Sequence, residues 1–381
     1  MRESFHRSVN LVFIRLMRDI EDYYRYRVPG ASPAVLNDTS NARRQAYLSR
    51  FADQEGTTFL KRFYNKYRGQ TEAQRLETVL KGLRIMPLRL AVIYRSVCPN
   101  AGLEPFTAYL KAHLPAAVFA RQDPGELYTK YAIGKFNLPD RGYLAHVHPL
   151  DLWMLNYLDQ HPQATFRDIV AGSAAQRQEV YGWLFHSRFK AAQDKRIRIL
   201  MEQDAFKEIG KAWRSLGYPF QSLVPSLATT LGASGDTPAA LAGLTGILEN
   251  GGVKYPIVRV SRLHFGEGSP TETILDAGTG PKGRVLAPEI ASAVRQEMIG
   301  VVSEGTGQRA YHSLPLPDGT FVPVGGKTGT GDNRYDTFAP GRRLISSRVV
   351  NRTATFVFFI GDRFFGTVTA FVPGEVAGNY S

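Results

Sequence analysis

The sequence is short of cysteine, of long apolar runs and of a leader-like beginning. Its single cysteine, Cys98, excludes an internal disulfide and a cysteine-based metal cluster, and it fits a plain core position. No apolar run approaches the ~18 residues that a membrane span needs. The first eight residues lack the apolar core of a signal peptide. Taken at face value, these absences predict a cytoplasmic protein.

Acidic residues are also in the minority. The chain has 34 of them against 47 basic ones, which gives a net charge of +13 over 381 residues. This balance suits an anionic neighbour such as nucleic acid, lipid headgroups or an acidic polymer, and it selects none of them. Hydrophobic residues make up 43% and charged residues 21%, which predicts a folded chain of one large domain or two to three ordinary ones.

Hydrophobic periodicity divides the chain near residue 220, where glycine and proline become more frequent. The patterns predict helices over 4–26, 176–216, 238–250 and 288–304, a loop over 121–149, and strands over 321–330, 353–360 and 364–372. Only Gly361, Asp362 and Arg363 separate the last two strands, which indicates a hairpin. The C-terminal third is therefore expected to be α/β or α+β with antiparallel strands.

Two features of the helical part have both a functional and a structural interpretation. The stretch 60–67 carries an aromatic stripe with basic residues opposite, which could bind nucleic acid, but a buried stripe is the preferred interpretation. His146 and His148 alternate and could share a metal on a strand. Because Pro149 follows directly and no third ligand is evident, no metal site is predicted.

Glycine, lysine and threonine crowd into 324–331, Val-Gly-Gly-Lys-Thr-Gly-Thr-Gly. Glycines let a backbone approach a ligand closely, while Lys327 supplies a cation beside two threonine hydroxyls. A phosphate-binding P-loop is excluded, because Phe321 stands where that motif needs glycine and no helical pattern follows Thr328. The alternative is the Lys-Thr-Gly strand of penicillin-interacting serine enzymes.

Three further stretches, together with this one, resemble the transpeptidase domain of class A penicillin-binding proteins, which are bifunctional peptidoglycan glycosyltransferase/D,D-transpeptidases. They follow the family's order: an S-x-N motif, a segment leading into a helix that ends Asn-Gly-Gly, a V-x-x-G-T element and the Lys-Thr-Gly strand. In this chain they are Ser8-Val9-Asn10, residues 223–226 with 231–238, residues 302–307, and Lys327-Thr328-Gly329. The resemblance covers about residues 3–18 and 220–374.

The resemblance implies a serine β-lactamase-like transpeptidase fold, an antiparallel sheet flanked by helices, here incomplete and with a large helical insertion. It implies cross-linking in peptidoglycan biosynthesis, and so a role in the cell wall and in cell shape. The reaction would be D,D-transpeptidation of D-Ala-D-Ala stem peptides through an acyl-enzyme, inhibited by β-lactam antibiotics. No metal and no diffusible cofactor is implied.

The same resemblance implies roles for six residues. Ser8 is expected to relay a proton toward the leaving amine, Asn10 to orient the donor-strand amide, and Lys327 to support the relay electrostatically. The substrate-binding residues are Thr328, Gly329 and Thr330: the threonines would bind the substrate carboxylate, and the Thr330 N–H would lie in the oxyanion hole. Helix capping is the alternative role of Ser8 and Asn10.

The family's first motif, S-x-x-K, supplies the nucleophile and its activating lysine, and no such string precedes Ser8. The string Ser187-Arg188-Phe189-Lys190 stands in the wrong order and is interpreted as coincidence. We therefore expect a fragment of a larger reading frame, inactive alone. Its parent is expected at the periplasmic face of the bacterial inner membrane, held by an anchor that lies before S-x-x-K.

The predicted organisation is a transpeptidase S-x-N segment over 1–18, a mostly helical insertion over 19–217 and the C-terminal transpeptidase part over 218–381. Expected partners are peptidoglycan stem peptides, β-lactams and cell-envelope assembly proteins, and not nucleic acid. The alternative function is a catalytically inert basic scaffold that binds a partner through 19–217. An unpaired strand edge, and hence poor solubility alone, is also expected.

Overall fold

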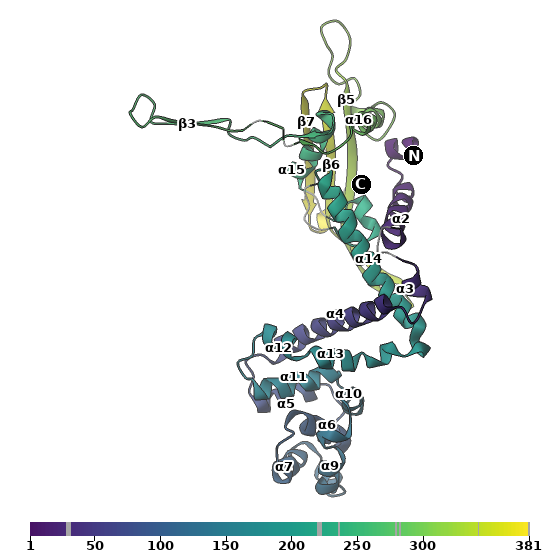
Figure 1. The fold of residues 1–381 in the computed structure, drawn as a ribbon, viewed down its shortest axis with the longest axis vertical. Coiled ribbons are helices and arrows are strands. Elements are labelled where there is room, and N and C mark those ends of the chain that lie inside the picture. The colour runs from purple at the N-terminus through teal and green to yellow at the C-terminus, as the bar shows by residue number, and fades with distance from the viewer. Residues whose placement is uncertain are drawn as a thin grey trace. The chain divides into compact units, whose positions relative to one another are not determined.

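The computed structural model describes residues 1–27, 32–218, 223–234, 237–278, 280–281, 283–341 and 343–379 (Figure 1). The chain folds as two compact units: Met1–Ser32 with Glu202–Ser381 form unit 1, and Pro33–Met201 form unit 2. Within the described ranges both helices and antiparallel strands are present, so the expected mixed α/β class is confirmed. Part of the quoted segment 231–238, residues 235 and 236, lies outside the described residues.

Unit 2 is helical throughout its described part, with short 3₁₀ turns between helices. Its helices are α3 (Ala34–Asn37), α4 (Ala42–Tyr67), α5 (Glu72–Leu80), α6 (Pro87–Val97), α7 (Leu103–His113), α8 (Ala116–Phe119), α9 (Pro124–Lys130), α10 (Leu138–Ala145), α11 (Pro149–Gln160), α12 (Phe166–Gly172) and α13 (Ala174–Val180). The 3₁₀ turns are η1 (Ile133–Lys135), η2 (Gly182–Phe185) and η3 (Ser187–Phe189). Helix α14 (Lys190–Ser215) begins in unit 2 and ends in unit 1.

The prediction of a loop over 121–149 was wrong, because α9, η1 and α10 fill most of it. The polar and proline residues there cap helices instead of breaking them. The Asp123 carboxylate accepts hydrogen bonds from the backbone N–H groups of Gly125 and Glu126, and the Asn137 side chain accepts one from Asp140 N–H. Pro124 and Pro139 sit in the first turn, where a missing N–H costs nothing.

The core of unit 2 contains the aromatic stripe of α4. Leu60 and Tyr67 are fully buried and Phe63 is nearly so, within a cluster formed by side chains of α4, α6, α7 and α11. The structural interpretation of 60–67 is therefore confirmed. The basic residue Lys66 reaches out of this stripe to the buried Asp151 on α11, with 3.1 Å between Nζ and Oδ2.

The described part of unit 1 combines helices with three small antiparallel sheets. Its helices are α1 (Arg2–His6), α2 (Asn10–Tyr26), α15 (Pro238–Glu249) and α16 (Pro288–Ser303), with 3₁₀ turns η4 (Leu227–Leu231), η5 (Gln308–Ala310) and η6 (Glu375–Asn379). Its strands are β1 (Val253–Lys254), β2 (Arg262–Phe265), β3 (Thr273–Asp276), β4 (Gly283–Arg284), β5 (Val324–Phe338), β6 (Leu344–Ile360) and β7 (Phe364–Pro373). The predicted helices over 238–250 and 288–304 are confirmed.

The largest sheet has the order β5-β6-β7, and α15 and α16 pack against it. The hairpin predicted at residues 361–363 is confirmed, because β6 and β7 pair from Ile360–Phe364 onward. Strands β5 and β6 run farther than predicted and pair as far as Phe338 and Leu344. In the described ranges the outer edge of β7 has no strand beside it, and Phe364, Val368 and Phe371 on this strand are exposed.

A second hairpin, β2–β3, extends away from the sheet in Figure 1. One of its faces carries ion pairs, Arg262 with Asp276 at 2.6 Å and His264 with Glu272 at 2.5 Å. Cross-strand pairing places Leu263 opposite Leu275, and both are about half exposed (45% and 54%). Two-stranded hairpins are marginally stable in water and exposed pairs add little, so this element depends on its attachment to the unit.

Two predicted helices are interrupted. The helix expected over 4–26 breaks after His6, because Ser8 adopts a left-handed conformation with φ 54°. The tract over 176–216 is interrupted between α13 and α14, where the Trp183 and Phe189 rings meet edge to face with 5.1 Å between centroids.

Unit 2 is shorter at both ends than the insertion expected over residues 19–217. Met17 of α2 packs with Phe206 and Ile209 of α14, and this cluster joins both helix segments to unit 1. The change of unit consequently falls at 32/33 and 201/202.

Candidate functional site

Ser8 lies in a tight turn between α1 and α2. The Val9 N–H donates to the Ser4 carbonyl (2.9 Å) and the Ser8 N–H to the Phe5 carbonyl (3.3 Å), which is the Schellman arrangement at a helix end. Glycine usually occupies the left-handed position of this motif, and a non-glycine residue there costs about 1–2 kcal/mol. The turn therefore holds the Ser8 backbone in a strained conformation, which sets the direction of its side chain.

The Lys327 ammonium meets this turn from strand β5. Its Nζ donates a hydrogen bond to Ser8 Oγ and a second, of 2.9 Å, to the Thr328 carbonyl. Burial lowers the pKa of Lys327 below its ordinary 10.5. A lysine with a lowered pKa exchanges protons more readily with a hydroxyl, so the pair can pass a proton. Phe5 lies nearby, with its ring centroid 5.9 Å from Nζ.

Thr328 and Thr306 form the adjoining part of the site. Their hydroxyl oxygens are 2.6 Å apart and joined by a hydrogen bond. Thr306 lies three residues after the end of α16 and belongs to the V-x-x-G-T element, to which no residue role was assigned. Gly329 and Thr330 continue along β5 and are exposed, and a Cβ built on Gly329 would meet nothing within 4 Å. A ligand can therefore approach the strand at 329–330.

The glycines of 324–331 divide into two kinds. A Cβ on Gly325 would come within 2.2 Å of the Phe359 ring, and one on Gly326 within 2.5 Å of the Phe356 ring. These two glycines make room for aromatic rings of β6 and not for a ligand. The prediction that the glycines clear space for a ligand therefore fits only Gly329 and Gly331, whose Cβ positions are open. As expected for a non-P-loop, a strand and not a helix continues after Thr328.

Asn10 is the first residue of α2 and is exposed. Its side chain makes no hydrogen bond to any residue within the described ranges. Val9 occupies the N-cap of α2 and provides no side-chain cap, so neither Ser8 nor Asn10 caps this helix. The structure thus brings Ser8, Lys327 and Thr328 together, whereas Asn10, two residues after Ser8, shares no side-chain hydrogen bond with them.

His6 is a site residue that the sequence did not reveal. Its ring is buried between α1 and α16, with Nε2 3.0 Å from Glu297 Oε2. Its backbone carbonyl accepts a hydrogen bond of 3.1 Å from the Thr306 N–H. No motif contains this histidine, and only its spacing of two residues from Ser8 could have drawn attention to it.

The other candidates lie in unit 2. Lys190 donates to Asp194 Oδ2 at 2.6 Å and to the Leu36 carbonyl at 3.0 Å. The His148 ring stacks on Phe59, with 4.2 Å between centroids, and burial lowers the pKa of His148 to about 4. His148 Nδ1 also accepts a hydrogen bond from the Leu150 N–H at the start of α11. These contacts fit structural roles.

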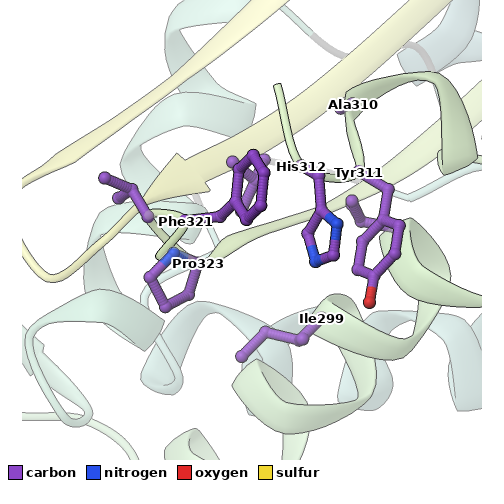
Figure 2. Close-up of a pocket in the computed structure, with 9 residues that line it drawn as sticks. Ile299, Ala310, Tyr311, His312, Phe321 and Pro323 are labelled. Atoms are coloured by element: carbon purple, nitrogen blue, oxygen red, sulfur yellow. The ribbon is translucent and has the colours of Figure 1, made fainter. Parts of the chain in front are cut away.

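A cavity of about 250 Å³ lies in unit 1 between α16 and the start of β5. Figure 2 shows the rings of Tyr311, His312 and Phe321 side by side near Ile299 and Pro323. The His312 ring stacks on Phe321 at 4.2 Å and on Tyr311 at 3.8 Å between centroids. Phe321 lies in the loop that leads into β5, so the stack joins this loop to His312 and Tyr311.

Metal-ligand clusters and membrane-spanning helices are both absent from the described residues. No three His, Cys, Asp or Glu side chains in these ranges converge as metal ligands would. Among the same residues, no helix combines the length and the apolar character that a membrane crossing requires.

No protein-family model matches the chain, and no curated protein matches it. Parts of several solved structures are similar. An acyl-enzyme complex of penicillin-binding protein A from M. tuberculosis is 16% identical over 46% of this chain and 41% of its own, with a TM-score of 0.29. The apo form of penicillin-binding protein 3 from the same organism is 18% identical over 47% of this chain and 43% of its own, with a TM-score of 0.30.

The D,D-transpeptidase domain of a peptidoglycan glycosyltransferase from Eggerthella lenta is 18% identical, over 46% of each chain, with a TM-score of 0.29. The chain spans less than half the length of each of these structures. Likeness at this level assigns no function to the chain and no role to its residues.

Proposed function

We propose that unit 1 provides the lysine and threonine wall of a penicillin-binding D,D-transpeptidase site. The observation that carries this proposal is the hydrogen bond from Lys327 Nζ to Ser8 Oγ, which joins two motifs 319 residues apart in sequence. The order of the motifs had related them to one reaction, and the contact is the one that a proton relay needs.

In the proposed reaction, a serine hydroxyl attacks the carbonyl carbon of the penultimate D-alanine of a stem peptide. The bond to the terminal D-alanine breaks and its amine leaves with a proton, which Ser8 passes on with support from Lys327. The amine of an acceptor peptide then attacks the resulting ester and releases the serine. The attacking serine belongs to the S-x-x-K motif of the family and not to the residues gathered at this site.

Thr328 and Thr330 are proposed to bind the terminal carboxylate, with the Thr330 N–H helping to hold the oxyanion. The open side of β5 at Gly329 and the exposure of Thr330 support this assignment. Asn10 is proposed to orient the donor-strand amide, which its exposed place at the start of α2 permits.

The same proposal includes the family class of the chain, its origin, its location and its partners. They are class A membership, a fragment origin, action on peptidoglycan at the periplasmic face of the inner membrane, and β-lactams and cell-envelope assembly proteins as ligands or partners. Support comes from the four motifs in family order. The partial likeness to penicillin-binding structures adds no further support.

The test measures non-covalent binding of a peptide ending in D-alanyl-D-alanine to the full chain, by NMR titration. Thr328→Val and Thr330→Val should each weaken binding about tenfold or more, because each removes a hydrogen bond to a charged group. Thr337→Val is the matched control, since Thr337 is an exposed threonine farther along the same strand. Equal effects of Thr328→Val and Thr337→Val, or no binding at all, would contradict the proposal.

Fluorescent penicillin supplies a second measurement, applied to this chain and to the longest reading frame that contains it. Covalent labelling of the longer product alone is the expected result. Labelling of Ser8 in this chain would make Ser8 the nucleophile and contradict its role as a relay. If neither product is labelled, the inert scaffold becomes the better explanation.

A further inference from the structure

We propose that His6 is a positioning residue for Ser8: it anchors α1 to α16, so that the strained turn after α1 presents the Ser8 hydroxyl to Lys327. The inference depends on the proposed function only for the role of Ser8 in catalysis. The anchoring concerns packing within unit 1 and can be tested without substrate.

Carboxylates lie near both nitrogen atoms of the His6 ring, and the one at hydrogen-bond distance belongs to Glu297. Nε2 lies 3.0 Å from Glu297 Oε2, and Nδ1 lies 3.8 Å from Glu304 Oε2. The other oxygen of Glu297 pairs with Arg2 Nε at 2.7 Å, so α1 contributes two cation-capable side chains to one carboxylate of α16. Only 11% of the His6 side chain is exposed, in contrast to 80% of the Arg2 side chain. His6 is the buried member of this cluster.

Two glycines form the niche that receives His6. A Cβ on Gly300 of α16 would lie 2.2 Å from His6 Nε2, and a Cβ on Gly305 would lie 2.3 Å from the His6 carbonyl oxygen. The same oxygen accepts a hydrogen bond of 3.1 Å from the Thr306 N–H. Ring and backbone of His6 are therefore both seated where only glycine leaves room, next to the threonine that contacts Thr328.

Ser8 follows His6 by two residues and needs such an anchor. Its left-handed backbone is unfavourable for a residue with a Cβ and persists only where its surroundings impose it. Helix α1 has five residues, too few to be stable by itself in water. With α1 fixed at His6, the two backbone bonds of the turn hold Ser8 in place. Without the anchor, the turn is expected to relax and Ser8 Oγ to move away from Lys327.

Lys327 reports this change directly. Its ammonium is half-buried beside Ser8 and Phe5, both of which belong to the anchored segment. The experiment follows the side-chain signals of isotopically labelled lysine by NMR during a pH titration of the full chain, and Lys327→Arg assigns the signal. In the wild-type chain this signal should titrate below the ordinary lysine value of 10.5.

Two matched pairs of variants separate anchoring from general damage. Gly300→Ala drives a methyl group into the His6 ring, whereas Gly243→Ala places the same methyl in α15 with nothing within 4 Å. His6→Leu removes the bond to Glu297, whereas His6→Gln keeps a donor near the position of Nε2. We expect the Lys327 titration to return toward 10.5 in Gly300→Ala and His6→Leu, and to stay lowered in Gly243→Ala and His6→Gln.

Retention of the lowered Lys327 titration in folded Gly300→Ala and His6→Leu would overturn the proposal. If those variants fail to fold, Glu297→Gln serves instead, because it keeps the size of the side chain and removes the charge by which Glu297 holds His6 and Arg2 of α1. If the Lys327 titration changes in the variants as expected but the chain binds no peptide, the proposed function is refuted and the anchoring is not. If the chain binds the peptide but the Lys327 titration stays lowered in Gly300→Ala and His6→Leu, the anchoring is refuted and the proposed function is not.

Discussion

Lys190 and Lys327 each stand in a pattern typical of serine enzymes, yet their surroundings differ. Lys190 completes the S-x-x-K string, and its ammonium pairs with Asp194, which also binds the buried Arg44 at 2.7 Å. Lys327 has the Ser8 hydroxyl and a backbone carbonyl as its hydrogen-bond partners, and burial lowers its pKa. A lysine neutralised by a carboxylate serves to hold structure, whereas one that faces a hydroxyl can exchange protons.

The largest expected effect tests whether the Lys190 cluster is structural. Arg44 is fully buried, donates hydrogen bonds to Gln193 and forms an ion pair with Asp194. Arg44→Met should destabilise unit 2 by about 3–5 kcal/mol, because it leaves a partly buried carboxylate without its main cation. Hydrogen exchange of α4 and the first half of α14 measures the loss. Arg43→Met is the control: Arg43 is exposed on the same helix, and its effect should stay within about 0.5 kcal/mol.

A smaller effect is expected from Lys327→Met. The folded chain holds Lys327 at a lowered pKa, so between that value and 10.5 the unfolded chain binds more protons and wild-type stability rises with pH. The methionine variant lacks this term. It should therefore be more stable than the wild-type chain at neutral pH, by less than the Arg44→Met loss, and the difference should vanish as the pH rises through 10.5. Denaturant unfolding from pH 7 to 11 checks this, and a difference independent of pH would contradict it.

The smallest effect is expected from Lys190→Met. The Lys190 side chain is 43% exposed, and ion pairs of such partly exposed side chains contribute about 0.2–1 kcal/mol to stability. Lys195→Met, an exposed lysine on the same helix, provides the baseline. A loss above about 2 kcal/mol relative to Lys195→Met would show that Lys190, and not Arg44, is the main partner of Asp194, and the comparison of the two lysines would then need revision.

The sequence predicted much of the local structure of unit 1. Pro238 and Pro288 marked helix starts, and Gly361 marked the β6–β7 hairpin, because these features depend on short stretches of backbone. The same signals misled at 121–149, where Asp123 and Asn137 cap helices in place of forming a loop. A cap and a turn use the same residues, and only the packing of the following helix distinguishes them.

The candidate site divides in the same way. The sequence by itself determined the chemistry on offer at 324–331, and the order of motifs, through the family resemblance, predicted that this stretch acts together with Ser8. The tertiary structure alone decided that Gly325 and Gly326 accommodate aromatic rings, and that His6 is seated against α16 beside Ser8. Local propensities are written in neighbouring residues, whereas these contacts join positions about 30 to 300 residues apart, which only the packed chain brings together.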